Sequence, residues 1–266
     1  MPELPEVETV VRGLRAPLVG RTFTTAKVLW PKTVKPLTPA EFESRLPSQK
    51  VTAITRRAKY LQFQLSAGDT MFIHLKMSGN LLVEPTDSPV HKHVRAIMGL
   101  DNGHQLRFKD TRKFGRIYLT DDPHSVIGKL GPEPLPDSFT VDDFKALFAK
   151  RRGRLKPLLL NQQFIAGIGN IYADESCFIA QIDPRRQADT LSETELTRLY
   201  QAIRQALNHG IVHKGASLDA VYLGGEFQNH FQAYGRTGQP CFTCGTEISR
   251  IVLGGRSTHF CSRCQQ

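Results

Sequence analysis

Near the end of the sequence stand Cys241-Phe242-Thr243-Cys244 and Cys261-Ser262-Arg263-Cys264, separated by sixteen residues. Two Cys-x-x-Cys pairs at this separation can bring four soft thiolates to one tetrahedral metal, and zinc is the usual occupant of such a site. Two disulfides or a rubredoxin-like iron site are the alternatives. Because the start of the sequence lacks the pattern of a secretory signal, we expect reduced cysteines and one Zn²⁺.

The residues between the two cysteine pairs predict a β-hairpin. Leu253-Gly254-Gly255-Arg256 contains a glycine pair suited to a tight turn. A hairpin of this size holds no hydrophobic core of its own, so the metal would supply its folding free energy. Since four thiolates leave no open position on zinc, we expect this metal to be structural and the chemistry to lie elsewhere in the chain.

The composition predicts a polyanionic partner. The 266 residues include 35 Lys and Arg against 25 Asp and Glu, a formal net charge of +10, and the sequence pI is about 9.5. Zinc bound by four thiolates would lower that charge by two. No stretch approaches the ~18 apolar residues of a membrane-spanning helix. We therefore expect an intracellular protein without a membrane segment, and nucleic acid as the more probable partner than an anionic membrane surface.

The first 130 residues combine one helix with many short strands. Residues 5–19 carry apolar side chains at i, i+3, i+4 and i+7, with Gly20 just beyond, which predicts an amphipathic helix. Gly68-Asp69 and Asn102-Gly103 predict hairpin turns. An antiparallel sandwich or a barrel-like domain fits this pattern. The expected strands are 51–54, 60–65, 71–75, 81–83, 96–100 and 105–108.

The second half of the chain has a helical period. Residues 131–136 contain three prolines and predict a semi-rigid linker. Ser192 with Glu195 forms a capping box at the start of the last expected helix. The fold class is therefore α+β, an N-terminal antiparallel β-sandwich with a leading helix followed by a helical domain and the zinc hairpin. The expected helices are 141–152, 156–160, 170–180 and 192–214. The expected domains are 1–130, a linker at 131–139, 140–235 and 236–266.

The N-terminus offers an unusual nucleophile. If Met1 is removed, Pro2 becomes a secondary α-amine on a rigid ring, and α-amines titrate near pH ~7.7–8.0. Part of the population is then unprotonated at neutral pH and can form an iminium ion with an aldehyde. Glu3 precedes a helix N-terminus, whose dipole stabilises a carboxylate, and it could transfer a proton. A proline of ordinary structural function is the plainer alternative.

Several motifs together resemble one family. Residues 1–9 (MPELPEVET) are similar to the opening of bacterial formamidopyrimidine-DNA glycosylases, which excise oxidised purines and cut the strand. Residues 74–79, 110–115, 167–173 and the four-cysteine hairpin occur in that family's order and spacing. The resemblance spans essentially the whole chain, and it implies a bifunctional glycosylase and abasic-site lyase, with a helix–two-turn–helix element in the helical half.

The resemblance implies a catalytic set. Pro2 corresponds to the nucleophile that attacks C1′ of the damaged nucleotide, and Glu3 to the acid that helps open or protonate the sugar. Lys59 corresponds to a phosphate-binding lysine assigned to β-elimination, although by itself it would be interpreted as a solvated lysine. Arg256, in the hairpin turn, corresponds to an arginine assigned to δ-elimination. A planar guanidinium matches phosphate geometry bidentately.

The resemblance also implies DNA-binding residues. An enzyme acting on a base inside a duplex must extrude that base and fill the gap, which is the part assigned to Met77, Arg112 and Phe114. Core packing is the alternative for the two apolar residues, but the polar, glycine-containing context of both favours exposed loops. The other expected contacts are Glu6 near the lesion pocket, Asn170 at a Gly-rich helix N-terminus, His91 and Arg151 at phosphates, and Lys156 beside the DNA groove.

Two positions depart from the family pattern. Lys92 follows His91 where the family commonly has an acid, and Asp219 stands where it often has lysine or arginine in a loop that covers the extruded base. The lesion range is therefore open. Cys177, outside the zinc set, predicts a buried structural thiol.

Two other functions compete with this one. A glycosylase for oxidised pyrimidines shares the Pro-Glu start and the zinc hairpin, and Leu4 with the 112–114 segment favours the purine enzymes. A non-catalytic zinc protein that binds DNA would explain the charge but not Pro2, Glu3 and Lys59 together. We expect a monomer that binds damaged duplex DNA in the bacterial cytoplasm, at the nucleoid.

Overall fold

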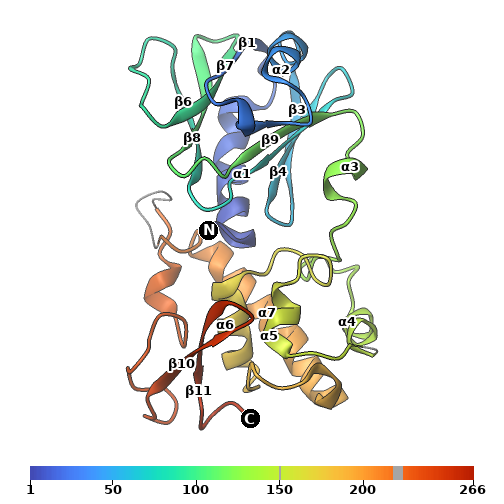
Figure 1. Ribbon diagram of the computed structural model, residues 1–266, viewed down its shortest axis with the longest axis vertical. Helices are drawn as coiled ribbons and strands as arrows, with labels where there is room; N and C mark the ends of the chain where they lie inside the picture. Colours follow the sequence, from blue (N-terminus) through green and yellow to red (C-terminus); the bar gives the residue numbers. More distant parts are fainter. Residues whose placement is uncertain (150, 218–223) are drawn as a thin grey trace. The chain divides into compact units, whose positions relative to one another are not determined.

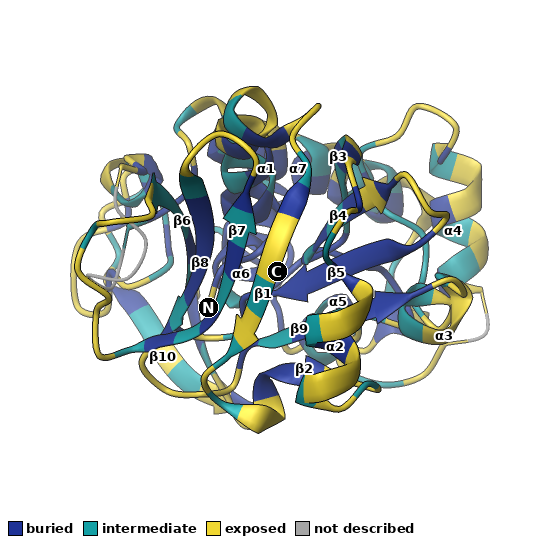
Figure 2. Ribbon diagram, turned by 90° about the horizontal axis from the view of Figure 1, so that it is seen from above, coloured by how far each residue is buried: buried dark blue, intermediate teal, exposed yellow. Residues whose placement is uncertain are grey.

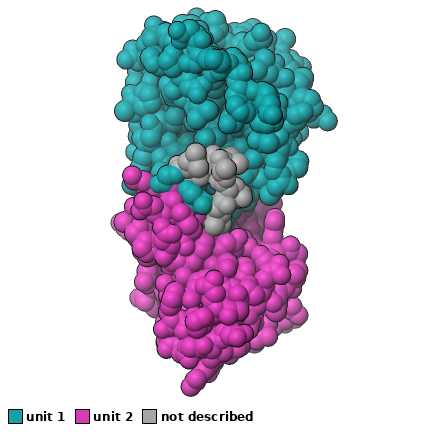
Figure 3. Space-filling view, turned by 90° about the vertical axis from the view of Figure 1, so that its left-hand side faces the viewer, with its two compact units in different colours: residues 1–129, 217–224 teal, residues 130–216, 225–266 magenta. Residues whose placement is uncertain are grey.

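The computed structural model describes residues 1–149, 151–217 and 224–266, and the chain forms two compact units (Figures 1 and 3). Unit 1 comprises residues 1–129 with 217–224, and unit 2 comprises residues 130–216 with 225–266. Asp219 lies outside the described residues. Among the described helices, none is both long and apolar enough to cross a membrane.

Unit 1 opens with helix α1 (Leu4–Leu18), close to the predicted range. Pro5 lies in its first turn, where the missing amide hydrogen costs nothing. Val7, Val11 and Leu18 are fully buried and form one face of the core of unit 1. The chain leaves the helix through Gly20, whose φ of 88° suits glycine.

Two sheets complete unit 1, as the strand pattern predicted. Figure 2 shows buried strands lying between more exposed edges. Strand β7 buries every second residue, as expected of a strand with one face on the core. The first sheet has the order β1 (Phe23–Val28), β7 (Val94–Leu100), β8 (His104–Asp110), β6 (Gly79–Pro85). The second has the order β2 (Val34–Lys35), β9 (Arg116–Thr120), β5 (Thr70–His74), β4 (Tyr60–Leu65), β3 (Val51–Arg57).

The predicted turns join the expected strands. Gly68-Asp69 connects β4 to β5, and Asn102-Gly103 connects β7 to β8 with a φ of 77° at Gly103. The pairing is antiparallel except between β2 and β9, which run parallel. That pair departs from the purely antiparallel sandwich that the sequence predicted.

Several elements of unit 1 were not predicted. Strand β1 has half of its residues exposed and one buried, so it carries no apolar run to find. Helix α2 (Pro39–Arg45) buries Phe42 as its one fully buried side chain, and its capping box of Thr38 and Glu41 went unrecognised. A short 3₁₀ turn (Pro31–Thr33) and helix α3 (His124–Ile127) are likewise additional.

Unit 2 contains the predicted helices with small changes in their ends. Ser192 and Glu195 form the expected capping box at α7. The predicted extension of the first helix to Arg152 is wrong, because α4 ends at Phe148 and residues 151–152 are not helical. The helices are α4 (Val141–Phe148), α5 (Leu155–Leu160), α6 (Asn170–Ile179) and α7 (Glu193–Val212). Short 3₁₀ turns are η2 (Ala188–Thr190) and η3 (Phe227–His230).

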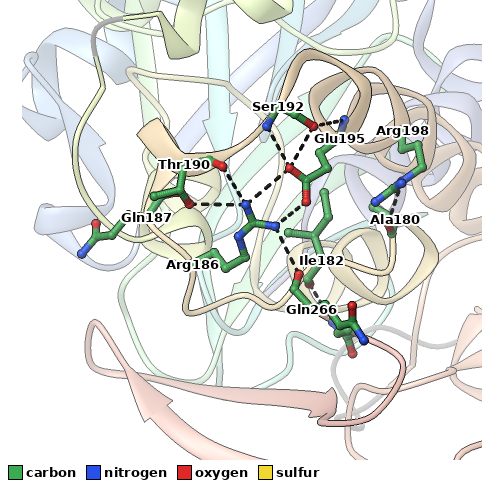
Figure 4. A network of polar contacts seen from close by, with 10 residues as sticks. Ala180, Ile182, Arg186, Gln187, Thr190, Ser192, Glu195, Arg198 and Gln266 are labelled. Carbon is green, nitrogen blue, oxygen red and sulfur yellow. Dashed lines mark hydrogen bonds and ion pairs between the residues drawn. The ribbon is translucent and has the colours of Figure 1, made fainter.

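Arg186 joins the start of α7 to the end of the chain (Figure 4). Its guanidinium pairs with Glu195 of the capping box and donates to the Thr190 carbonyl at 2.7 Å and the Gln266 carbonyl at 3.5 Å. Arg204 of α7 donates to the carbonyls of residues 134 and 135 at 2.9 and 2.8 Å. The proline-rich segment is therefore fixed on α7.

Asp69 should make the stability of unit 1 sensitive to acid. Burial acts to raise the pKa of this carboxyl, but hydrogen bonds from Arg45 and Gln49 outweigh it and lower the pKa. The lowered pKa stabilises the folded state at neutral pH, and the contribution disappears as pH falls through the folded pKa, below ~3.9. We expect Asp69→Asn to lower the free energy of unfolding by ~1–3 kcal/mol at pH 7 and by less at pH 3.

Urea unfolding at the two pH values measures this difference. The exposed Asp121, which also faces Arg45, provides the matched control as Asp121→Asn. An Asp69→Asn deficit that is equal at both pH values would contradict the assignment.

Candidate functional site

The N-terminal residues are held in place before α1 begins. Pro2 is buried, and Glu3 and Glu6 are 3% and 2% exposed. The Glu3 amide donates to Glu6 Oε2 at 2.8 Å, so the first-turn carboxylate fixes the backbone that carries Pro2 and Glu3. The positive end of the helix dipole favours both carboxylates.

The packing of α1 on β3 shows what its N-terminus faces. Arg15 donates to the Ile54 carbonyl at 3.0 Å, and Glu8 pairs with Arg56 at 3.1 Å. The helix therefore runs opposite to β3, and its start points toward the turn between β3 and β4 (Figure 1). Lys59 lies in that turn and is 4% exposed. The structure thus brings the predicted lysine to the same end of unit 1 as the predicted nucleophile.

His74 belongs to the same end of the sheet, and the sequence assigned it no role. It pairs with Tyr60 across β4 and β5. Burial, followed by the charges of Lys76 and Lys59, lowers the pKa of His74 to about 3, so the ring is neutral. Its Nδ1 accepts from the Lys76 amide at 3.0 Å, which fixes the backbone just before Met77. The burial of His74, which identifies it as part of this end of the sheet, is visible only in the structure.

A buried carboxylate joins the two loops that carry the predicted gap-filling residues. Asp110, 1% exposed, accepts from the Ser78 hydroxyl in one loop and from the amides of Arg112 at 3.1 Å and Gly115 at 2.7 Å in the other. The Ser78 oxygen also accepts from the Arg112 amide at 3.0 Å. The two loops therefore behave as one rigid surface.

Both loops contain a residue in the left-handed backbone conformation. Lys76 and Lys113 have φ of 54° and 61°, a left-handed turn directly before Met77 and Phe114. The side chains of Met77 and Phe114 are 39% and 48% exposed, and the Arg112 guanidinium lies 5.3 Å from the Phe114 ring. The predicted exposure of these loops is confirmed. Such large apolar side chains in water are poised to contact something else.

Asp110 should be needed to position these loops. In Asp110→Asn, one carboxylate oxygen is replaced by a side-chain NH₂ group, which cannot accept a hydrogen bond. A backbone N–H that donates to that oxygen in the wild type would therefore lose its acceptor. We expect unfolding to be easier by ~1–3 kcal/mol and lesion excision to fall more than duplex affinity does. The exposed Asp122, on the turn after β9, gives the control variant Asp122→Asn. Unchanged excision in Asp110→Asn would reject the positioning role.

The four cysteines form one cluster in unit 2. All four Sγ atoms lie within 4.8 Å of one another, with Cys241–Cys264 at 3.9 Å and Cys244–Cys261 at 3.5 Å. Zinc–sulfur bonds of ~2.3 Å in a tetrahedron place sulfurs ~3.8 Å apart, so the cluster fits Zn²⁺. The thiols are separate, as predicted for a metal site rather than disulfides.

The zinc cluster is fastened to the helices. Hydrogen bonds from Thr246 lower the pKa of Cys244 to about 6, which favours the thiolate that a metal requires. Gln265 accepts from the Cys261 amide at 2.8 Å and donates to the Ile182 carbonyl at 3.0 Å, beyond the end of α6. Cys177 on α6 is fully buried, and burial raises the pKa of its thiol, so the prediction of an inert structural cysteine is confirmed.

The hairpin forms as predicted and presents Arg256. Strands β10 (Ile248–Leu253) and β11 (Arg256–Cys261) pair antiparallel around Gly254 and Gly255, whose φ values are 58° and 74°. Arg256 is exposed at the start of β11. Next to it, the Ser257 hydroxyl accepts at 3.3 Å from Nδ2 of the side chain of Asn170, the first residue of α6. The turn and that helix N-terminus therefore lie together.

Lys156 corrects one prediction. Its side chain is 0% exposed, its ammonium lies 2.6 Å from Asp174 Oδ1, and it donates to the Ser257 carbonyl at 2.6 Å. Asp174 also accepts from the amide and the ring of His259 at 3.0 and 2.9 Å. A fully buried ammonium cannot reach a DNA phosphate, so Lys156 positions the hairpin instead of contacting DNA.

Breaking this buried pair should destabilise the hairpin. Lys156→Met leaves Asp174 as an uncompensated buried charge, for which we expect a loss of ~3–5 kcal/mol in the free energy of unfolding. Lys156→Met/Asp174→Asn removes that charge and should recover part of the loss. Urea unfolding compares the two variants with the wild type. A double variant less stable than the single one would contradict this account.

Two further predicted DNA contacts, His91 and Arg151, are accessible, whereas Glu6 is buried. His91 is exposed ahead of β7, and its Nδ1 accepts from the His93 amide at 3.2 Å. Arg151 is exposed beside the Phe164 ring, at 5.6 Å. Of the basic run from Lys145 onward, Arg152 and Arg154 are also exposed.

Comparisons with known families agree with this architecture. The formamidopyrimidine-DNA glycosylase N-terminal domain matches residues 1–117, the H2TH domain of the same enzymes matches residues 130–221, and the zinc finger found in FPG and IleRS matches residues 238–266. The fold and the zinc cluster define a zinc-finger DNA-repair glycosylase with a helix–two-turn–helix element.

The chain belongs to the formamidopyrimidine-DNA glycosylase family. It is 46% identical to a formamidopyrimidine-DNA glycosylase of Herpetosiphon aurantiacus over 100% of both chains, and 44% identical to that of Pelotomaculum thermopropionicum over 100% of this chain and 99% of the other. It superposes with a TM-score of 0.94 and 36% identity on the Lactococcus lactis protein solved with DNA containing N7-benzyl-Fapy-dG, covering 100% of both chains.

Proposed function

We propose that this protein removes oxidised purines, such as 8-oxoguanine and formamidopyrimidines, from duplex DNA and then cuts the strand at the resulting abasic site. The observation that carries the proposal is the buried Pro2-Glu3 pair, held by Glu6 at the start of α1 and facing the turn that carries Lys59. Neighbouring structures of Lactococcus lactis Fpg were solved with abasic-site and Fapy-dG DNA.

The nucleophile would be the Pro2 nitrogen after removal of Met1. It attacks C1′ of the damaged nucleotide, the bond from C1′ to the base breaks, and the base leaves with a proton. Opening of the sugar yields an iminium ion on the proline, with Glu3 as the acid at the ring oxygen. The iminium acidifies C2′–H, so loss of that proton expels the 3′ phosphate, and a second elimination expels the 5′ phosphate. Water then releases the proline.

Lys59 and Arg256 would act on the two eliminations. Lys59 is assigned to β-elimination and to a flanking phosphate. The ring of His74 near Lys59 is neutral, so it adds no positive charge beside the lysine. Arg256 is assigned to δ-elimination and to phosphates beside the lesion, where its planar fork suits two oxygens.

DNA would be bound mostly through phosphates, and therefore in a salt-sensitive manner. Met77 and Phe114 would fill the gap left by the extruded base, and Arg112 would hydrogen-bond to the orphaned partner base. His91, Arg151 and Asn170 would hold phosphates, and Glu6 would lie near the lesion.

Three domains and a linker would divide this work. We assign residues 1–130 to the catalytic β-sandwich, 131–139 to a linker, 140–235 to the helical DNA-binding domain and 236–266 to the zinc hairpin. The protein would act as a monomer in the bacterial cytoplasm, at the nucleoid.

Excision of oxidised pyrimidines is the second candidate function. A Lactococcus lactis neighbour was solved with DNA containing an oxidised pyrimidine. A panel of single-lesion duplexes separates the two substrate classes. If oxidised purines are the preferred substrates, duplexes that contain them should be cut at a lower enzyme concentration than duplexes that contain oxidised pyrimidines.

Borohydride trapping tests the nucleophile. On an 8-oxoguanine:cytosine duplex, we expect a covalent adduct that peptide mapping places on an N-terminal Pro2. Pro2→Gly retains a primary amine but loses the ring, so its trapping should fall by at least ~10-fold while binding to an uncleavable abasic analogue persists. Pro134→Gly, in the segment fixed on α7, is the matched proline control. Undiminished trapping by Pro2→Gly would remove Pro2 from the mechanism.

A further inference from the structure

Three of the chain's nine histidines converge in unit 2, apart from the zinc cysteines. His209 lies on α7, His213 caps the C-terminal end of that helix, and His230 ends the 3₁₀ turn η3. Each offers a ring nitrogen, and the three nitrogens lie within 4.8 Å of one another. His209 and His213 both place their rings against His230 of η3.

The rings are crowded against one another. Ring centroids are 3.8 Å apart for His213 and His230, 4.6 Å for His209 and His213, and 5.1 Å for His209 and His230. Protonating all three would place like charges in contact.

The elements that carry these rings are fixed by packing. Phe227 of η3 stacks on Tyr172 of α6 with centroids 5.2 Å apart and planes within 6°. The Glu226 amide donates to the His213 carbonyl at 2.9 Å. A side chain at Gly210 would lie 2.4 Å from the Tyr172 hydroxyl, so this glycine lets α7 approach α6 closely. Ligands on such rigid supports lose little entropy on binding a metal.

The chemistry of the cluster selects the ion. Neutral imidazoles suit Zn²⁺, Cu²⁺ and Ni²⁺, whereas Mg²⁺ and Ca²⁺ prefer oxygen ligands. Tetrahedral zinc with bonds of ~2.0–2.1 Å needs nitrogens ~3.3 Å apart, which these rings reach by shifts of about an ångström.

An adjoining cavity of about 330 Å³ reaches His209 and His230 and leaves room for water on the ion. Glu175 also lines that cavity, but its oxygens accept the amides of residues 232–234 at 2.8–2.9 Å. The carboxylate is thus engaged in holding the chain after η3, and the donor set is three imidazoles.

We propose that His209, His213 and His230 bind one divalent transition-metal ion of the zinc type, with solvent in the fourth position, and that this second metal clamps α7 to η3. It is separate from the four-cysteine zinc. The site rests on unit 2 alone and does not depend on the proposed excision chemistry.

Cobalt titration of the full-length protein, with zinc kept in the cysteine site, tests this proposal. We expect one equivalent of Co²⁺ to bind with visible d–d absorption and without thiolate-to-cobalt charge transfer. His213→Ala should weaken binding by at least ~10-fold, because one of three ligands is lost. The exposed His124 lies in unit 1, so His124→Ala is the control and should bind as the wild type does. Zn²⁺ should raise the Tm of the wild type and of His124→Ala, but not that of His213→Ala.

Three results would overturn the proposal. They are no cobalt bound above the one zinc equivalent, cobalt bands of thiolate type only, or equal affinity in His213→Ala and His124→Ala. Circular dichroism and zinc content check that each variant is folded. Should His213→Ala fail that check, His230→Gln replaces it, because it keeps the side-chain volume on η3 and leaves α7 unaltered.

Discussion

Three of the side chains proposed to contact DNA, Met77, Phe114 and Arg256, are exposed, and the loops that carry them depend on buried carboxylates that hold the backbone beneath them. Asp110 ties the Met77 loop to the Phe114 loop, and Asp174 ties the hairpin to α6. An exposed loop has no core of its own, and a desolvated carboxylate makes strong hydrogen bonds to backbone amides. Each of these carboxylates therefore fixes a surface segment by hydrogen bonds, where hydrophobic packing is lacking.

The zinc cluster and the Lys156–Asp174 pair hold the hairpin in place at its two ends. Four thiolates close the end near the C-terminus, and the buried ion pair fixes β11 beside Arg256. The metal supplies folding free energy, while the ion pair supplies position, because a buried pair adds little net stability but penalises other arrangements. Arg256, which we propose to bind phosphate, would need both.

The sequence predicted the elements whose pattern is local. The leading helix, six strands, the glycine turn of the hairpin and the capping box at Ser192 all follow from spacing within a few residues. It missed strands β2 and β9. It also missed β1 and α2, because an edge strand and a short surface helix bury too few side chains to leave a periodic signal. Lys156 shows what the sequence could not predict about the site. A run of basic residues has the same sequence pattern whether one of its lysines faces solvent or pairs with an aspartate eighteen residues further along the chain.

The sequence by itself determined the zinc ligands, the family and the candidate nucleophile, because these are encoded in residue identity and order. Tertiary structure decided which charges are buried and what they hold: the neutral ring of His74, the carboxylate of Asp110 between two loops, the ammonium of Lys156 under the hairpin. It also brought His230 to His209 of α7 and to His213 at the end of that helix. Burial and contact between distant residues depend on how the elements pack, and a linear pattern carries no record of that packing.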